Sequence, residues 1–382
     1  MKLETFSYRA NFGWSRPDFP EMDSEKTAII VFGSTSFAEN PGKIDALVKA
    51  YPNSKILGCS TAGEIFNTEV FDESLSIAVM QFEHTTLKLA QAQTGAGQES
   101  FEAGRLLAAE LNSPELRGVF IISNGLKVNG TELLRGIKSI LDKSVVVTGG
   151  LAGDGKRFEK TWVLSKEGFT SDVVMALGFY GNAIQISHGS KGGWDLFGPE
   201  RLVTRSKANI LYDIDRTPAL KLYKEYLGER ASGLPSTGLL FPLALRSHKD
   251  DSKTLVRTIL AVDEVHQSIT FAGDIPEGSY VQLMRANFDR LIDGAAQAGE
   301  MTSVGVNNTG GPTLALAISC VGRRLVLGER TEEEIEATKE NLPAGTSLIG
   351  FYSYGEISPY VSGESCDLHN QTMTVTTFCE ST

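Results

Sequence analysis

The sequence ILGCSTAGEI at residues 56–65 starts with an apolar pair and ends with a glycine, a carboxylate and isoleucine. Three further segments repeat this order of a small or aromatic residue, glycine, an acid, and then isoleucine or glycine. We call the four copies glycine–acid turns, and they lie at residues 62–65, 152–155, 272–275 and 354–357. A pattern that repeats through a chain indicates that one structural unit is used several times.

The residues around these turns predict alternating strands and helices. Three of the turns, all except 272–275, follow an apolar run, a helical pattern of apolar residues and a second apolar run. The first apolar runs are 28–32, 119–123 and 314–319, and the helical patterns that follow them are 44–51, 133–141 and 331 onward. The turn at 272–275 differs, because its helical pattern, at 288–296, comes after the turn. This order predicts an α/β fold with two packed domains, whose mixed sheets are built from repeated strand-helix-strand units.

Particular residues predict where two of these helices begin. Asn40 followed by Pro41 is typical of an N-cap and a first helical residue. Thr331 and Glu334 have the spacing of a capping box. Glycines at strand ends allow the backbone to approach a ligand, and ligands prefer the carboxyl ends of strands in open α/β sheets. We therefore expect the glycine–acid turns to lie near one another and to line a pocket.

The boundary between the two domains is marked only by a change of pattern. A glycine-rich, irregular segment at 187–199 precedes strand-like runs, and Pro218 then opens a helical pattern. We place an N-terminal extension at 1–27, a first domain at 28–216 and a second at 217–376. The sequence has no low-complexity linker at this point, so we expect the domains to pack together.

Composition excludes several classes of partner. The 382 residues include 41% hydrophobic and 22% charged residues, which is ordinary for a globular protein. A net charge of -11 argues against nucleic acid or an anionic membrane as the main partner. The sequence contains no apolar run of the roughly 20 residues that a membrane span requires, and its start lacks a signal-peptide core. With four scattered cysteines in no metal-binding spacing, we expect a cytoplasmic protein.

Two segments partly match known motifs, one for phosphate binding and one for a catalytic nucleophile. GLAGDGKR at 150–157 has Arg157 where a phosphate-binding loop needs Ser or Thr, and Asp154 would repel phosphate. The following residues, 158–164, are strand-like, although such a loop should open a helix. GCSTA at 58–62 resembles a nucleophile elbow, which leaves a hydrolase or transferase using Ser60 or Cys59 as an alternative. That alternative requires a base such as His369 or His188 nearby, and a buried structural thiol is the commoner state of a free cysteine.

Several motifs in their order resemble the FIST family, a pair of sensory and signal-transduction domains. The resemblance covers about 28–376, nearly the whole chain. Two segments resemble motifs of the FIST N domain, namely 56–65 and 149–154. The segments that resemble motifs of the FIST C domain are 218–220 with 223–228, 271–278, 319–323, 350–357 and 369–372.

The resemblance implies a small-ligand sensor that is not an enzyme, with amino acids or related metabolites as ligands. Because the two domains fill the chain, we expect it to signal through a separate protein. Members of the NosP type bind haem, sense nitric oxide and regulate a histidine kinase. If this chain is of that type, His369 or His188 would ligate the iron. A pure interaction module, without a pocket, is the remaining alternative.

The residues that we expect to bind the ligand come from the turns and their surroundings. Carboxylates, hydroxyls and amides suit a polar, zwitterionic ligand such as an amino acid, and two tyrosines would supply aromatic walls. The predicted binding residues are Ser60, Thr61, Glu64, Asn124, Asp154, Tyr352, Tyr354, Glu356, His369 and Asn370.

Overall fold

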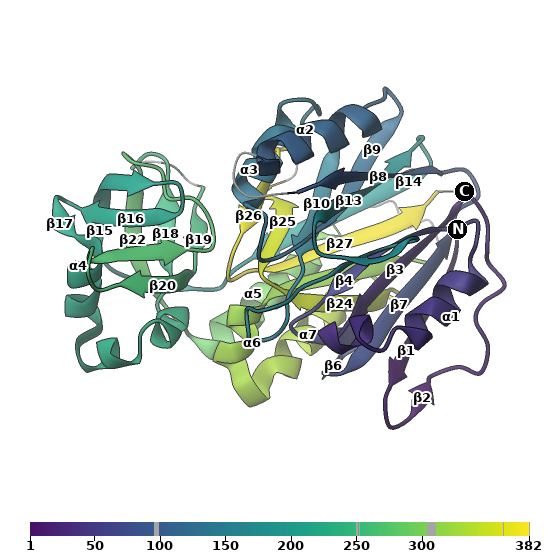
Figure 1. Cartoon of the computed structure of the whole chain (residues 1–382), viewed down its shortest axis with the longest axis horizontal. Helices are drawn as coiled ribbons and strands as arrows, with labels where there is room; N and C mark the ends of the chain where they lie inside the picture. Colours follow the sequence, from purple (N-terminus) through teal and green to yellow (C-terminus); the bar gives the residue numbers. More distant parts are fainter. Residues whose placement is uncertain (95–98, 250, 252, 304–310, 362, 382) are drawn as a thin grey trace.

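The computed structural model describes residues 1–94, 99–249, 251, 253–303, 311–361 and 363–381. It consists of a large body, which holds both chain termini, and a small lobe at one side (Figure 1). The body contains three units in which a parallel strand pair is joined by a helix and followed by a hairpin and a return strand. The small lobe is inserted into the third unit. The predicted mixed α/β fold is confirmed.

The first unit starts at the N-terminus. It contains β1 (Lys2–Arg9), β2 (Gly13–Trp14), β3 (Thr27–Gly33), the short 3-10 helix η1 (Thr35–Ala38), α1 (Gly42–Ala50), β4 (Lys55–Ser60), the hairpin β5 (Glu64–Phe66) and β6 (Glu69–Phe71), and β7 (Ser74–Gln81). The second unit contains β8 (Thr86–Gln93), α2 (Glu99–Leu111), β9 (Leu116–Ser123), α3 (Gly130–Lys138), β10 (Val146–Leu151), the hairpin β11 (Val163–Ser165) and β12 (Gly168–Thr170), and β13 (Val173–Tyr180).

The third unit is interrupted after its first strand. It contains β14 (Ile184–Lys191), α5 (Phe288–Met301), β23 (Leu314–Cys320), α6 (Val321–Leu327), η4 (Gly328–Arg330), α7 (Thr331–Glu340), β24 (Ser347–Ser353), the hairpin β25 (Gly355–Pro359) and β26 (Cys366–His369), and β27 (Met373–Glu380). The inserted small lobe contains β15 (Asp195–Lys207), β16 (Ile210–Ile214), β17 (Thr217–Pro218), α4 (Ala219–Leu227), η2 (Gly228–Gly233), η3 (Ser236–Leu240), β18 (Leu243–Arg246), β19 (Leu255–Arg257), β20 (Ile259–Asp263), β21 (Ser268–Phe271) and β22 (Tyr280–Arg285).

The three units exchange their hairpins in a ring. The hairpin strand β5 of the first unit pairs with β24 of the third, β11 of the second pairs with β4 of the first, and β25 of the third pairs with β10 of the second. Each hairpin therefore extends the sheet of another unit. Because every glycine–acid turn in the body lies between a parallel strand and its hairpin, this exchange brings the turns of the three units together.

Each unit also has a glycine at the same place in its parallel pair. Gly58, Gly149 and Gly350 lie beside Val31, Ile121 and Ala317 of the neighbouring strand. A Cβ at any of the three glycines would collide with the carbonyl oxygen of that neighbour. The shared steric requirement supports the sequence-based prediction of one repeated unit.

The small lobe has its own hydrophobic core and joins the body through a separate cluster. Trp194, Leu291 and Val326 of the body pack with Ala244 and Met284 of the lobe in that cluster. Residue 216 lies between β16 and β17, which pair with each other, so the lobe extends across the sequence boundary that separates 28–216 from 217–376. Residues 2–9 of the N-terminal segment form β1, which pairs with β7.

The predicted strands and helices are present, but some predicted helix starts differ. Helix α1 begins at Gly42 with Pro41 at the N-cap position, so the prediction of Asn40 as N-cap and Pro41 as first helical residue is wrong by one residue. The predicted capping box at Thr331 is also wrong. Glu334 is 0% exposed, and its carboxylate accepts hydrogen bonds from Arg323, Ser319 and Tyr352 in the core instead of capping the helix. Of the strand-like residues 158–164, only Val163 and Leu164 are in a strand.

Candidate functional site

Three of the glycine–acid turns meet at one junction inside the body. Gly153 donates its backbone N–H to the carbonyl oxygen of Ser60 over 2.9 Å, and Ala62 donates to that of Tyr352 over 2.8 Å. Tyr354 in turn donates to the carbonyl oxygen of Leu151 over 3.1 Å. The first, second and fourth turns are therefore in direct contact, and the prediction that these turns cluster is confirmed for them.

The acids of these three turns are directed into the protein and are held by neighbouring donors. Glu64 accepts from the N–H and the hydroxyl of Ser74, at 3.0 and 2.8 Å, and contacts the Thr61 hydroxyl. Glu356 accepts from the Ser353 hydroxyl at 2.7 Å and from the N–H and hydroxyl of Thr372. Burial raises the pKa of Glu64 to about 7 and that of Glu356 to about 8.

Asp154 organises the loop that follows the second turn. Its carboxylate accepts the backbone N–H groups of Phe158, Glu159 and Lys160 at 2.8 to 2.9 Å and also contacts the Tyr354 hydroxyl. Burial by itself raises the pKa of Asp154, but the hydrogen bonds from Tyr354 and the backbone outweigh it, so the pKa is lowered. The Phe158 ring stacks on Tyr354 with 4.4 Å between centroids and 11° between planes. Asp154 thus acts as a structural anchor for a flat aromatic wall.

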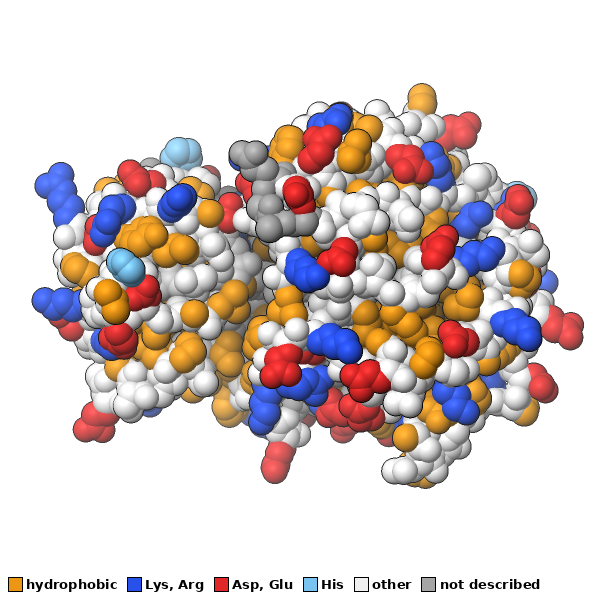
Figure 2. All heavy atoms as spheres, viewed as in Figure 1, with side chains coloured by type: hydrophobic (Ala, Val, Ile, Leu, Met, Phe, Trp, Pro, Cys, Tyr) orange, Lys and Arg blue, Asp and Glu red, His pale blue; other side chains and the backbone are white. Residues whose placement is uncertain are grey.

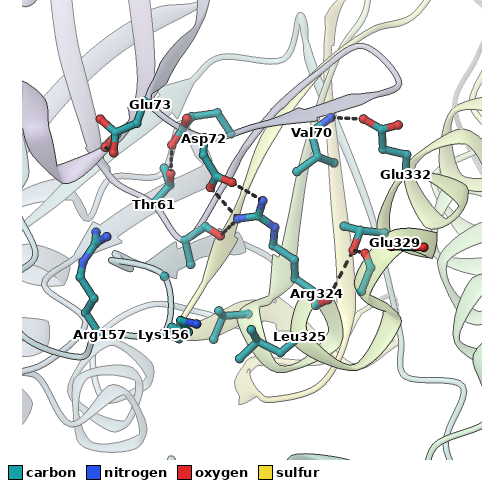
Figure 3. A pocket seen from close by; sticks show the side chains of 17 residues that line it. Thr61, Val70, Asp72, Glu73, Lys156, Arg157, Arg324, Leu325, Glu329 and Glu332 are labelled. Atoms are coloured by element: carbon teal, nitrogen blue, oxygen red, sulfur yellow. Dashed lines mark hydrogen bonds and ion pairs between the residues drawn. The ribbon is translucent and has the colours of Figure 1, made fainter.

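Two large cavities lie on either side of the start of α6, and their walls share Lys156, Val321 and Leu325. The first, of about 820 Å³, lies between the β5–β6 hairpin, the loop at 155–157 and the segment from α6 to α7 (Figure 3). Arg324 extends across it to form two 2.8 Å contacts with Asp72. This cavity carries charged side chains of both signs, and its principal arginine is already paired.

The second cavity, of about 680 Å³, lies between the small lobe and the body, and we call it the interlobe cavity. Figure 2 shows one face of the boundary between lobe and body, with hydrophobic side chains along part of it. The body contributes the loop after β9, the loop after β10, the start of α6, Tyr354 and Asn370. The lobe contributes η3, the region from Thr258 to Leu260, and the end of β21 with Gly273 and Asp274, which belong to the remaining glycine–acid turn.

The interlobe cavity contains buried polar groups from both parts of the molecule. Asn370 is 0% exposed, and within the part of the chain that the structure describes neither its Oδ1 nor its Nδ2 has a hydrogen-bond partner. Thr258 of the small lobe is 5% exposed, and its hydroxyl likewise has no partner among the described residues. Native proteins satisfy most buried polar side-chain atoms, so two such groups in the wall of one cavity point to a ligand.

The predicted binding residues are divided between different environments. Tyr354 and Asn370 line the interlobe cavity, whereas Thr61 and Glu64 line the first cavity. The others line neither of these two cavities and bond to neighbouring protein groups. Ser60 accepts the N–H of Trp162, and Asn124 accepts the N–H groups of Leu126 and Lys127. Tyr352 donates to Glu334, His369 bonds to the carbonyl oxygen of Ser358, and Asp154 and Glu356 have the partners described above.

The two histidines considered for haem do not fit axial ligation in these cavities. His369 is 2% exposed, its Nε2 lies 2.9 Å from the carbonyl oxygen of Ser358, and burial lowers its pKa to about 4. His188 lies on β14, and neither histidine lines either cavity. Among the described residues there is also no group of three or more His, Cys, Asp or Glu side chains suited to a metal ion.

Ser60 and Cys59 are placed as structural residues. Both are 0% exposed. The Ser60 hydroxyl accepts the backbone N–H of Trp162 at 3.0 Å. Burial, and to a lesser degree the neighbouring Glu64, raises the pKa of the Cys59 thiol, which disfavours the reactive thiolate. Neither side chain is accessible to a substrate in this arrangement.

Sequence reasoning missed the contribution of the small lobe. Thr258 and Leu239 carry no motif, and only the turn at 272–275 indicated that this region belongs to the site. Asp274 accepts from Asn129 of the body at 3.2 Å, and this turn lines the interlobe cavity together with Tyr354 of the fourth turn.

No curated protein matched the chain. Among solved structures, a cyanuric acid hydrolase from A. caulinodans is similar over 93% of this chain and 90% of its own, with 10% identity and a TM-score of 0.32. In the part of the chain that the structure describes, no helix has both the length and the hydropathy to cross a bilayer.

Two family profiles match adjoining segments that together cover most of the chain. The FIST N domain matches residues 27–217, and the FIST C domain matches 219–359. Both are sensory domains of signal transduction. The chain therefore belongs to the FIST family.

Proposed function

We propose that this protein is a sensor that binds a small polar metabolite, such as an amino acid, in the interlobe cavity and signals through a separate protein, such as a histidine kinase. The observation that carries the proposal is the carboxamide of Asn370, which is fully buried in the cavity wall and has no hydrogen-bond partner among the described residues. A volume of about 680 Å³ suits a small molecule.

The energetics favour a ligand that reaches this group. A buried donor or acceptor without a partner costs about 1–3 kcal/mol, and a carboxamide has both kinds of atom. A ligand that bonds to Asn370 removes this cost, whereas an apolar side chain at the same place would never incur it. An amide at this position is therefore explained by binding better than by folding.

The position of the cavity supports a mechanism of signalling. Its walls come from the body and the small lobe, and the chain crosses between them near Trp194 and again near Ala286. A ligand that bonds to both parts stabilises the arrangement in which they are close. By shifting the population of that arrangement, it changes the surface that a partner protein meets. Catalysis is not part of this proposal, because Ser60 and Cys59 are buried away from the cavity.

Thermal-shift and calorimetric titration against a panel of amino acids and a small-molecule cell extract would test the proposal. We expect at least one compound to raise the melting temperature of the wild type and to lose this effect in Asn370→Leu. Asn112→Leu, at an exposed position outside the cavity, is the matched control and should respond like the wild type. A flat response of the wild type to both the panel and the extract would count against a sensor of this kind.

A further inference from the structure

We propose that the ligand of the interlobe cavity is a neutral, flat heterocycle that carries an N–H donor and an acceptor side by side on one edge, as cyclic amides and nucleobases do. This inference rests on the proposed function and narrows the class of polar metabolite. It follows from three features of the cavity wall: the shape of the unpartnered amide, the charges around it and the aromatic surface beside it.

The first feature is the carboxamide of Asn370. Its Oδ1 accepts and its Nδ2 donates, and no described residue bonds to either atom. A single ligand group that satisfies both must present a donor next to an acceptor. An open-chain secondary amide is trans, so its N–H and C=O point in opposite directions, and a primary amide has the required edge but lacks the apolar faces that the aromatic wall described below favours. A ring holds them on the same edge, and rotation of the Asn370 amide allows that edge to be bound in either order.

The second feature is the distribution of charge. Of the charged side chains in the wall, Lys127 is paired with Asp172 at 2.6 Å, and Asp274 accepts from Asn129 and lies near the buried guanidinium of Arg257, whose Nε donates to the Asp274 carbonyl oxygen at 3.0 Å. Lys156 lies at an exposed position in the loop. Burying an ammonium and a carboxylate beside the uncharged Asn370 would be costly without new ion pairs. A neutral ligand avoids that cost, which disfavours a free zwitterion at this end of the cavity.

The third feature is the aromatic wall. Phe158 and Tyr354 are stacked within the lining, and the bond network of Asp154 holds them in place. The small lobe contributes apolar side chains to the same cavity, namely Leu239, Ile259, Leu260 and Phe271. Flat rings bind well between aromatic and aliphatic surfaces, because both of their faces are apolar while their edges are polar.

Thr258 supplies the contact that would connect the two parts of the molecule. Its hydroxyl, which has no partner in the described part of the chain, can donate or accept. A heterocycle bound to Asn370 by one edge has further ring nitrogens or carbonyl groups on its other edges. One of these bonding to Thr258 would join the small lobe to the body through the ligand.

Calorimetric titration with matched ring compounds would test this inference. The probes are uracil and hydantoin, together with dimethyluracil and dimethylhydantoin, in which both ring N–H groups are methylated. We expect the N–H compounds to bind the wild type at least about tenfold more tightly than the methylated compounds, which corresponds to the loss of one hydrogen bond. Thr258→Val should weaken the N–H compounds severalfold, and Thr94→Val, an equally buried threonine outside the cavity wall, should not.

The outcomes separate this inference from the proposed function. Equal binding of the methylated and unmethylated rings would overturn the donor–acceptor edge. If amino acids bind in a manner that depends on Asn370 while the rings do not, the inference is wrong and the sensor remains. If neither the rings nor the amino-acid panel and extract bind the wild type at millimolar concentration, both are wrong. Since the comparison of probes uses the wild type alone, it does not depend on how any variant folds.

Discussion

Gly153 donates its backbone N–H to the carbonyl oxygen of Ser60 over 2.9 Å, and this bond joins the second glycine–acid turn to the first. A side chain at residue 153 would have its Cβ at 3.0 Å from the nitrogen of Ala62 and at 3.3 Å from the carbonyl oxygen of Tyr352. The junction of the three units therefore depends on backbone atoms that approach closely because one residue has no side chain.

Gly153→Val should destabilise the protein by about 1–3 kcal/mol, because the new side chain overpacks the junction and its neighbours are main-chain atoms and the rigid Cβ of Ala62. Denaturant unfolding gives this value directly. Gly42→Ala is the control: a Cβ there meets nothing within 4 Å, so stability should stay the same or rise by up to about 1 kcal/mol. If Gly153→Val is as stable as the wild type, the junction can adjust to the added side chain.

Arg323→Met should cost about 3–5 kcal/mol of unfolding free energy, since it leaves the fully buried Glu334 without its cation. Arg323 donates to Glu334 at 2.6 and 2.9 Å, to the carbonyl oxygen of Leu291 at 2.7 Å and to that of Gly192. These last two residues lie where the chain passes between body and lobe, so the variant should also loosen the lobe.

Two comparisons test this explanation of the Arg323 effect. Adding Glu334→Gln to Arg323→Met should recover part of the loss, because the unpaired buried charge is then removed. Arg105→Met, which breaks an exposed ion pair with Glu102, should cost much less than Arg323→Met, because solvent screens the exposed pair. Equal losses for the buried and exposed arginines would contradict the importance of burial.

Glu356→Gln should flatten the dependence of stability on pH between about 4.5 and 8. The buried carboxyl of Glu356 has a pKa of about 8, above its ordinary value of 4.5, so the folded state holds a proton that the unfolded state releases. Its contribution to stability is fully present below about pH 4.5 and is lost as the pH rises toward 8, at up to about 1.4 kcal/mol per pH unit.

The measurement is the difference in unfolding free energy between wild type and Glu356→Gln across this pH range. A difference is needed because the raised pKa of Glu64 acts in the same direction, while the lowered pKa of His369 acts in the opposite one. Glu115→Gln, at an exposed position, should leave the slope unchanged. If the unfolding free energy of Glu356→Gln depends on pH with the same slope as that of the wild type, this carboxyl is not protonated in the folded state.

Asp154→Asn should loosen the loop at 158–160 and weaken ligand binding together. Asn keeps one acceptor oxygen, so it cannot accept all three backbone N–H groups and the Tyr354 hydroxyl, and the aromatic wall loses its anchor. Hydrogen exchange of the amides of Phe158, Glu159 and Lys160 should quicken, with a stability loss of about 1–3 kcal/mol. Asp142→Asn, at an exposed position, should change neither property.

The strands, the helices and the repeated unit could be predicted because each depends on residues close in sequence. The apolar runs and helical patterns of residues 28–51 and 119–141 describe β3, α1, β9 and α3 with small errors at their ends. Tyr354 and Asn370, which line the interlobe cavity, could be chosen as candidates from the sequence because they stand beside recognisable motifs. The roles of Asp154 and Glu356 were less accessible, since a carboxylate at a strand end can face a ligand or the protein interior.

The sequence by itself determined the α/β class, the repeated strand-helix-strand unit and the FIST family, because periodicity and motif order are properties of neighbouring residues. Only the tertiary structure decided that the hairpins are exchanged around a ring and that the small lobe is inserted after β14. It also decided that Thr258 and Asn370, 112 positions apart in the sequence, line the same cavity. Such long-range pairings depend on how whole units pack, and no local pattern of residues records them.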